Sequence, residues 1–230
     1  MKTIGLIGGM SWESATEYYK VINQEVKRRL GGLHSAKCIL FSVDFAEIEQ
    51  LQSRGDWEQA GIVLAKVALR LEKAGADFIV LCTNTMHKVI HLIEEAISIP
   101  IVHIADATSK TITHSKIKTV GLLGTQYTME QDFYTARINS NGIKVIIPNQ
   151  AERELINQVI YHELCLGKIQ LTSKRFFQQV IHRLMENGAE GIILGCTEIG
   201  LLIQQEDTGI SLFDTTQIHA EAAVSYALKI

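Results

Sequence analysis

The sequence predicts an α/β fold made of two similar, Rossmann-like halves, each with a parallel sheet. Apolar runs of strand length alternate with segments of helix length along the whole chain, a pattern typical of parallel sheets covered by helices on both faces. A short motif also occurs twice, once at Cys82-Thr83 and again at Cys196-Thr197. The two cysteines are 114 positions apart (196 minus 82), about half of the 230-residue chain. Each half is therefore expected to present one thiol from the end of a strand.

Other landmarks repeat at nearly the same interval. Residues 3–9 resemble residues 119–125 with an offset of 116 (120 minus 4), and the small-residue turns at Gly75 and Gly188 are 113 positions apart (188 minus 75). Three offsets that agree within a few residues indicate a duplicated architecture. The expected domains are residues 1–97 with 209–230, and residues 98–208.

The first half begins with a buried strand at residues 3–9 that runs into a glycine loop. Ser11 is expected to cap a helix over residues 12–30, because a short polar side chain accepts from the free N–H groups of a first helical turn. Apolar residues recur at i+4 on this helix, and Gly31-Gly32 end it. The further expected elements are a strand at 37–43, a partly helical connection at 44–57, a helix at 58–74, a strand at 77–81, a helix at 85–97, a strand at 101–104 and a helix at 105–114.

The pattern restarts at residue 119. The expected elements are a strand at 119–125, a helix at 128–140, a strand at 143–147, helices at 150–165 and 171–187, a strand that ends at Cys196, a helix at 198–203, a strand at 211–213 and a helix at 216–228. Ligands of such sheets bind beyond the carboxyl ends of the strands. Both glycine loops and both cysteines fall at these ends, so we expect one site between the halves where the two thiols face each other.

Composition excludes several classes of protein. Hydrophobic residues make up 47% of the chain and charged residues 20%, which argues against disorder. The net charge of −3 gives no footprint for nucleic acid, and no apolar run approaches the roughly 20 residues that cross a bilayer. The chain starts directly with a strand and shows no signal-peptide pattern, so we expect a cytoplasmic protein with free thiols rather than disulfides.

Cys82 and Cys196 are the candidate reactive groups. Each comes where a strand passes into a helix, where free N–H groups and the helix dipole stabilise a thiolate. A cysteine pKa starts at about 8.5, so a small lowering would bring these thiols close to neutrality. Cys38 and Cys165, in contrast, are expected to be small buried apolar residues.

Metal and nucleotide sites find little support. No C-x-x-C pair is present, and His87 and His91, which are spaced i, i+4, lack the glutamate of H-E-x-x-H, so no metal is expected. The glycine loop does not fit G-x-G-x-x-G. A small anion such as a carboxylate suits it better, held by backbone N–H groups near Met10 and Ser11. For Gly5 and Gly121, tight packing is an equally good explanation.

Hydroxyl and amide side chains beside the two cysteines are candidate donors to a bound ligand. Helix capping is their alternative role, and both roles can hold at once. These residues are Thr83, Asn84, Thr85, Thr125 and Thr197.

Taken together, these residues make the chain resemble the aspartate/glutamate racemase family of cofactor-independent amino-acid racemases. The resemblance covers essentially the whole chain. It rests on IGLIGGMSW at residues 4–12, SVDFAEIE at 42–49, CTNTMH at 82–87, GCTE at 195–198 and FDTT at 213–216.

The resemblance implies two halves related by pseudo-twofold symmetry and a two-base mechanism. Cys82 and Cys196 would be the catalytic pair: one thiolate takes the α-proton of the amino acid, and the opposite thiol returns a proton to the other face. It also implies that the protein is a homodimer. The implied substrate-binding residues are Met10, Ser11, Gln52, Thr83, Asn84, Thr85, Thr125, Thr197, Glu198 and Lys168.

One departure from the family pattern concerns the substrate. Aspartate-specific members use a basic residue in the Glu-Leu-x-x-Gly-x segment, where this chain has a leucine within residues 163–168. Lys168 or Arg54 is a candidate substitute, with a solvated helix face as the alternative role. Aspartate or glutamate is the default substrate, and neutral amino acids remain open. A maleate isomerase-like or decarboxylase-like two-cysteine enzyme and a non-catalytic amino-acid sensor are the alternatives.

Overall fold

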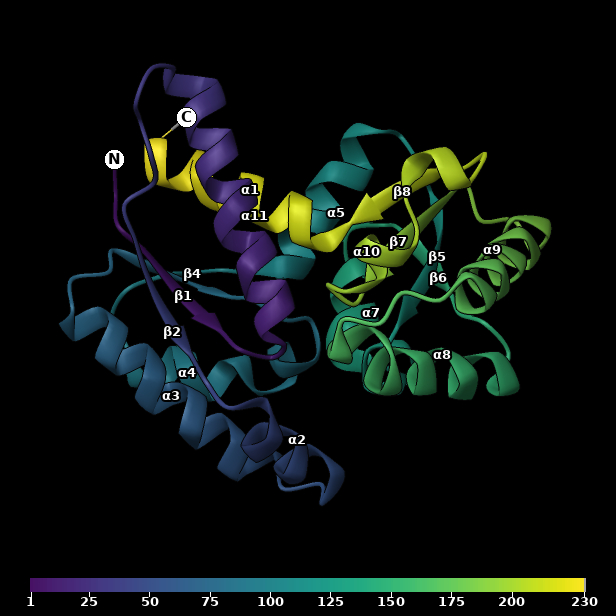
Figure 1. Cartoon of the computed structure of the whole chain (residues 1–230), viewed down its shortest axis with the longest axis horizontal. Helices are drawn as coiled ribbons and strands as arrows, with labels where there is room; N and C mark the ends of the chain where they lie inside the picture. Colours follow the sequence, from purple (N-terminus) through teal and green to yellow (C-terminus); the bar gives the residue numbers. More distant parts are fainter. Residues whose placement is uncertain (230) are drawn as a thin grey trace. The chain divides into compact units, whose positions relative to one another are not determined.

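The computed structural model describes residues 1–229 and divides the chain into two compact units. The first unit holds residues 1–104 together with the described residues from His219 on, and the second holds residues 105–218 (Figure 1). Each unit contains one four-stranded sheet whose strand pairs are all parallel. The expected α/β fold with two similar halves is confirmed.

The first unit has the sheet order β2-β1-β3-β4. Its elements are β1 (Ile4–Gly8), α1 (Trp12–Leu30), β2 (Cys38–Ser42), α2 (Phe45–Ser53), α3 (Trp57–Lys73), β3 (Phe78–Leu81), the 3₁₀ helix η1 (Thr85–Val89), α4 (Ile90–Ala96), β4 (Ile101–Val102) and most of α11 (Thr215–Leu228). Helices cover both faces of the sheet, which explains why its central strands are apolar throughout.

The second unit repeats the arrangement with the order β6-β5-β7-β8. Its elements are α5 (Ile104–His114), β5 (Thr119–Gly124), α6 (Gln126–Glu130), α7 (Asp132–Asn139), β6 (Lys144–Ile146), α8 (Gln150–His162), η2 (Leu164–Leu166), α9 (Leu171–Glu186), β7 (Gly191–Gly195), α10 (Ile199–Leu202), η3 (Gln205–Asp207) and β8 (Ser211–Asp214). Strand β5 corresponds to β1, and β7 corresponds to β3.

The boundaries of the compact units come later in the chain than the sequence suggested. The units divide after Ile104 and after Ile218, whereas the expected divisions were after residues 97 and 208. Strand pairing explains both shifts. Strand β4 pairs with β3 and so stays in the first unit, while β8 pairs with β7 and so stays in the second.

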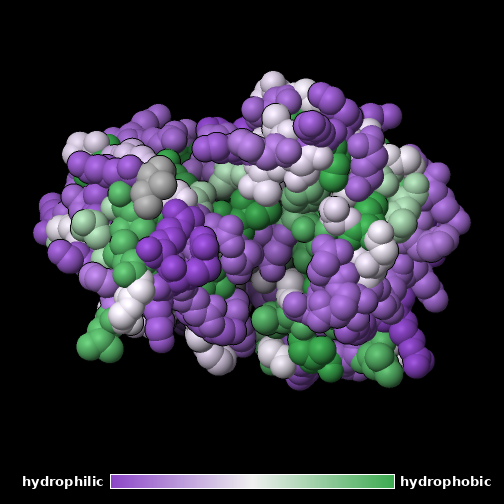
Figure 2. All heavy atoms as spheres, turned by 90° about the horizontal axis from the view of Figure 1, so that it is seen from above, coloured by the Kyte–Doolittle hydropathy of each residue, from purple (hydrophilic) through white to green (hydrophobic). Residues whose placement is uncertain are grey.

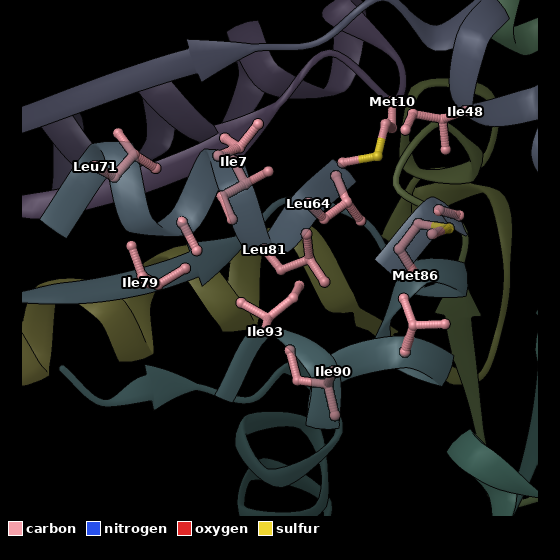
Figure 3. Packing of buried hydrophobic residues seen from close by; sticks show 14 of the residues in the cluster. Ile7, Met10, Ile48, Leu64, Leu71, Ile79, Leu81, Met86, Ile90 and Ile93 are labelled. Atoms are coloured by element: carbon pink, nitrogen blue, oxygen red, sulfur yellow. The ribbon is translucent and has the colours of Figure 1, made fainter. Parts of the chain in front are cut away.

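Two cores fill the first unit, one on each face of its sheet. On one face, α3 and α4 pack against β1 and β3 through a cluster that includes Ile7, Leu64, Leu81 and Ile93 (Figure 3). On the other face, α1 and α11 pack together through a cluster that includes Tyr18. Strand side chains alternate between the two clusters, as a pleated strand requires.

Two strand glycines occupy equivalent positions in the sheets. A Cβ on Gly5 would lie 2.8 Å from Ile79 Cδ1, and a Cβ on Gly121 would lie 2.7 Å from Ile192 Cδ1. Both distances are shorter than ordinary carbon–carbon contacts. Of the two explanations considered for these glycines, tight packing therefore accounts for them.

Two expected helices are interrupted. The helix expected at 85–97 begins as the 3₁₀ helix η1 and continues as α4, and the helix expected at 128–140 consists of α6 and α7 with Gln131 between them. Gln131 has an extended backbone, with φ −101° and ψ 149°. Helix α1, in contrast, spans the expected residues, with the Ser11 side chain accepting from Ser14 N and Gly31 at its end.

The surface carries no extended apolar face in the view of Figure 2, where hydrophobic groups are interrupted by hydrophilic residues. Single large apolar side chains are nevertheless exposed, among them Trp12 and Leu33. Within residues 1–229, no helix combines the length and the apolar character needed to cross a bilayer.

Candidate functional site

The two cysteines lie at equivalent positions of the two sheets. Cys82 directly follows β3, and Cys196 directly follows β7, each of which is an inner strand of its sheet. The neighbouring inner strands, β1 and β5, end beside them and lead into the loops at Gly9 and Thr125. Each thiol is thus placed at the carboxyl end of its sheet, where ligands of parallel α/β folds bind.

Cys82 has apolar and backbone surroundings. Its side chain is 1% exposed, and its Sγ lies 3.7 Å from Val80 O. Its backbone N–H donates to Ile7 O at 2.9 Å, which fixes the first residue beyond the strand. Burial raises the pKa of the Cys82 thiol, because the thiolate loses the solvation that it would have in water.

Cys196 has a carboxylate neighbour. Its thiol donates to Glu198 Oε2 at 3.0 Å, and the Thr197 hydroxyl donates to the same oxygen at 2.8 Å. Glu198 is only 2% exposed. Burial is the largest cause that raises the pKa of Cys196, and the negative charge of Glu198 adds to it by opposing a second negative charge nearby. The second thiol is therefore held in its protonated form.

The expectation of lowered cysteine pKa values was wrong for both thiols. The helices that follow the cysteines are the short η1 and the four-residue α10, so few aligned peptide dipoles act on either sulfur. Desolvation is the first cause for both residues and exceeds any such stabilisation.

In the first unit, the proposed binding residues gather at the ends of β1 and β3. Ser11 Oγ accepts from Ser14 N at 3.3 Å and caps α1, and Met10 packs in the core around Leu81 (Figure 3). Gln52 is 4% exposed, and its Nε2 lies 2.9 Å from Met86 Sδ. Thr83 and Asn84 are buried in the turn after Cys82, and Thr85 is buried at the start of η1.

Gly9 shapes the loop between β1 and α1. Its φ of 93° lies in the region that favours glycine, and a Cβ there would lie 2.6 Å from Val43 N. Both facts require a residue without a side chain. The loop therefore passes close to the backbone at the end of β2.

In the second unit, Thr125 and Thr197 follow the paired strands β5 and β7. Thr125 Oγ1 accepts from Thr128 N at 3.3 Å and caps α6, so the expected capping role is present. Lys168 is exposed in the turn after η2, where its backbone N–H donates to Glu163 O at 2.9 Å. Cys165 of η2 also contributes to the raised pKa of Cys196, so η2 lies near the Cys196 turn.

The sequence did not predict the cluster of buried histidines that contacts the turn after Cys82. His87 is 2% exposed, whereas His91 is exposed, so the two do not share one helix face. His87 Nδ1 lies 2.8 Å from Thr83 O, and its ring centroid lies 4.4 Å from that of His103. The i, i+4 spacing assumed an α-helix, but His87 belongs to η1. Within residues 1–229, no group of three or more His, Cys, Asp or Glu side chains could hold a metal ion.

Comparison with known proteins gives consistent results. The family model for Asp/Glu/Hydantoin racemase matches residues 7–223. The chain is 31% identical over 158 residues to the broad specificity amino-acid racemase RacX of Bacillus subtilis (strain 168), which covers 69% of this chain and 68% of that protein.

Solved structures match over almost the full length. A Yersinia pestis protein assigned as an Asp/Glu racemase is 56% identical with a TM-score of 0.91, covering 99% of this chain and all of the other. An aspartate racemase homologue from Pyrococcus horikoshii OT3 is 36% identical with a TM-score of 0.85, again covering 99% and 100% of the two chains.

Proposed function

Because the chain belongs to the Asp/Glu/Hydantoin racemase family and is an amino-acid racemase, we propose that it works without a cofactor and uses Cys82 and Cys196 as its two acid/base groups. The observation that carries the proposal is the equivalent placement of the two thiols, each one residue beyond an inner strand of a repeated sheet. A cysteine kept only for packing has no reason to recur at the same strand end.

The reaction exchanges one proton at each face of the substrate. One cysteine thiolate takes the α-proton, so the Cα–H bond breaks, an S–H bond forms, and the electron pair delocalises from Cα into the α-carboxylate. The other thiol then gives its proton to the opposite face of the planar carbon. The enantiomer forms, and the two sulfurs have exchanged protonation states.

Glu198 supports the view that Cys196 rests as a thiol. Its carboxylate accepts the hydrogen of Cys196 and opposes ionisation of the sulfur. The raised thiol pKa values also make each sulfur a stronger base once it is ionised, which suits a very weak carbon acid. The ammonium group of a bound amino acid would favour that ionisation by its positive charge.

Donors near the two thiols suit the charged groups of an amino acid. We assign Asn84, Thr85 and Thr125 to the α-carboxylate and Thr197 to the amino group, with Met10 and Ser11 contributing backbone N–H groups from the first glycine loop. Gln52 and Lys168 are assigned to the side-chain pocket. Hydrogen-bond donors at the carboxylate stabilise the carbanion-like state as its charge grows.

Aspartate or glutamate is the default substrate, and a broader range is supported by two observations. The relative from Bacillus subtilis is a broad specificity amino-acid racemase. The 163–168 segment of this chain offers leucine where a basic residue would bind a second carboxylate, and Leu166 is exposed there.

The test is a panel of L- and D-amino acids incubated with the protein in deuterated water, with loss of the α-proton followed by NMR. We expect exchange and racemisation with wild type, and loss of racemisation in Cys82→Ser and in Cys196→Ser. Cys38→Ser, at the start of β2, is the matched control and should retain activity. Turnover of maleate or a malonate without α-proton exchange of any amino acid would instead favour an isomerase or decarboxylase. Sedimentation analysis would test whether the protein forms the homodimer that the family resemblance implies.

A further inference from the structure

We propose that His87 is a positioning residue that fixes the turn carrying Cys82 and ties it to the point where the chain leaves the first unit. The proposal rests on the proposed function in one respect, namely that Cys82 is a catalytic thiol. His87 itself touches no reacting atom in this scheme. It acts through the backbone of the neighbouring Thr83.

The hydrogen bonds of His87 define its protonation state. Thr83 O can only accept, so His87 Nδ1–H donates to it at 2.8 Å. Ile104 N can only donate, so His87 Nε2 accepts from it at 3.3 Å. Both bonds are satisfied together only by the neutral imidazole with its hydrogen on Nδ1. A proton on Nε2 would remove the acceptor that Ile104 uses.

The two partners of His87 have different structural roles. Thr83 directly follows Cys82, so the bond to its carbonyl restrains the Thr83–Asn84 peptide, one residue beyond the thiol. Ile104 is the first residue of α5 and the last residue of the first unit. One buried side chain thus connects the Cys82 turn with the first chain crossing, the point at Ile104 where the chain passes from the first unit into the second.

The second chain crossing is held by a histidine in the same way. The chain returns to the first unit at His219, which is fully buried. His219 Nε2–H donates to Val102 O at 2.7 Å, and its Nδ1 accepts from the Tyr18 hydroxyl at 2.8 Å. The ring centroids of His87 and His219 lie 6.0 Å apart. The two crossings and the Cys82 turn therefore share one packed histidine cluster.

A histidine that only fills space in the core would be replaceable by any side chain of similar volume. The arrangement predicts instead that each ring nitrogen has a separate effect. His87→Asn keeps an amide donor near the Nδ1 position and loses the acceptor for Ile104. His87→Gln places a carbonyl near the Nε2 position and loses the short donor to Thr83. His87→Leu removes both, and His91→Leu, on the exposed neighbour, is the control.

The first measurement is independent of catalysis. Amide exchange of Ile104, followed by NMR, should become about tenfold faster in His87→Leu and His87→Asn, and should stay near wild type in His87→Gln and His91→Leu. Nitrogen NMR of wild type should show His87 with its hydrogen on Nδ1. Equal exchange in all four variants, or a hydrogen on Nε2, would overturn the proposal.

The second measurement uses the amino acid with the fastest α-proton exchange in the panel. We expect kcat to fall about tenfold in His87→Leu and His87→Gln with KM changed less than about threefold, and His87→Asn to recover most of kcat. If kcat is the same in the Asn and Gln variants, the Thr83 bond does not position Cys82, and the proposal fails. Should His87→Leu not fold, the Asn and Gln pair still decides.

The two measurements also separate this proposal from the proposed function. If wild type exchanges no α-proton of any amino acid, the racemase assignment of the thiols fails. The exchange of Ile104 and the hydrogen position on His87 would then still decide whether the histidine holds the Cys82 turn.

Discussion

The two units of the protein place a thiol at the same point of the same sheet, yet they surround it differently. In the first unit, Cys82 is bounded by backbone groups, with His87 bonded to the next residue. In the second, Cys196 donates directly to the Glu198 carboxylate. The buried histidines of the described chain, His87, His103 and His219, all belong to the first unit. A duplicated backbone thus fixes where the sulfur lies, while the side chains fix its chemistry.

The difference implies that the two thiols have unequal protonation equilibria. Desolvation raises the pKa of both, but only Cys196 also has a carboxylate within hydrogen-bonding distance. A racemase must run in both directions, since its reactant and product are mirror images with equal free energies in water. Unequal thiol pKa values are compatible with this requirement. In either direction one thiolate removes a proton and the other thiol donates one, so the same two proton transfers occur in both directions.

Removing either sulfur is the change with the largest expected effect. Cys82→Ala and Cys196→Ala should each lower racemisation at least about a thousandfold, because each removes one acid/base group. The remaining thiol can still remove and return a proton on its own face. Each variant should therefore exchange deuterium into one enantiomer only, and the two variants should select opposite enantiomers. NMR from each pure enantiomer measures this, and the same selection in both variants would show that the thiols do not serve opposite faces.

Acid should weaken the first unit through His219. Burial lowers the pKa of His219 to about 4 from 6.5, so between these values the unfolded chain binds a proton that the folded protein does not. The contribution of neutral His219 to the free energy of unfolding is fully present above pH 6.5. It falls by about 3 kcal/mol as the pH drops to 4.

Urea unfolding between pH 4 and pH 7 checks this dependence. Trp12 and Trp57, the two tryptophans of the chain, both belong to the first unit, so their fluorescence reports on that unit. His219→Asn should flatten the pH dependence, whereas the exposed His162→Asn in the second unit should leave it unchanged. An unaltered slope in His219→Asn would contradict the prediction.

Neutralising Glu198 should make the two thiols more alike. Glu198→Gln keeps an oxygen acceptor but removes the charge, so the pKa of Cys196 should fall while that of Cys82 stays constant. We expect the pH dependence of alkylation to shift to lower pH at Cys196 alone. Mass spectrometry of alkylated peptides separates the two sites. Glu206→Gln, on the exposed η3, is the control, and a shift at Cys82 would refute the local effect.

The smallest expected effects are losses of stability from two glycine-to-alanine substitutions, and they should be the same in both units. Gly5→Ala and Gly121→Ala each place a methyl group against an isoleucine side chain, and each should destabilise its unit by about 1 kcal/mol. Gly209→Ala is the control, because a Cβ there has open space. Thermal unfolding followed by circular dichroism measures all three. A large cost in one unit only would mean that the duplication of the packing is incomplete.

The predictable parts of the fold are those specified by neighbouring residues. Helix α1 was predicted to the residue, since Ser11, the i+4 apolar positions and Gly31 all lie within or beside it. The interruption at Gln131 was not predicted, because no proline or glycine marks it. The strand order in each sheet depends on pairing between distant segments, and β4 and β8 were expected in the wrong halves for that reason.

The candidate site shows the same division. The positions of Cys82 and Cys196 at strand ends followed from local patterns and are present in the structure. The raised pKa values of the two thiols could not be inferred from local patterns, because the burial of a sulfur depends on segments far away in sequence. The role of His87 was missed because Ile104, 17 residues further on, supplies its second partner.

The insertion of the second unit into the first has a consequence for biosynthesis. Residues 105–218 form one uninterrupted stretch, whereas the first unit needs α11 from the far end of the chain. Ala220, Ala223 and Val224 complete the core around Tyr18. On the ribosome, the inserted unit can therefore close while the earlier one still exposes an apolar groove along α1. The unit whose synthesis starts first would therefore be completed last, and a chain that stops before α11 would leave the core around Tyr18 open.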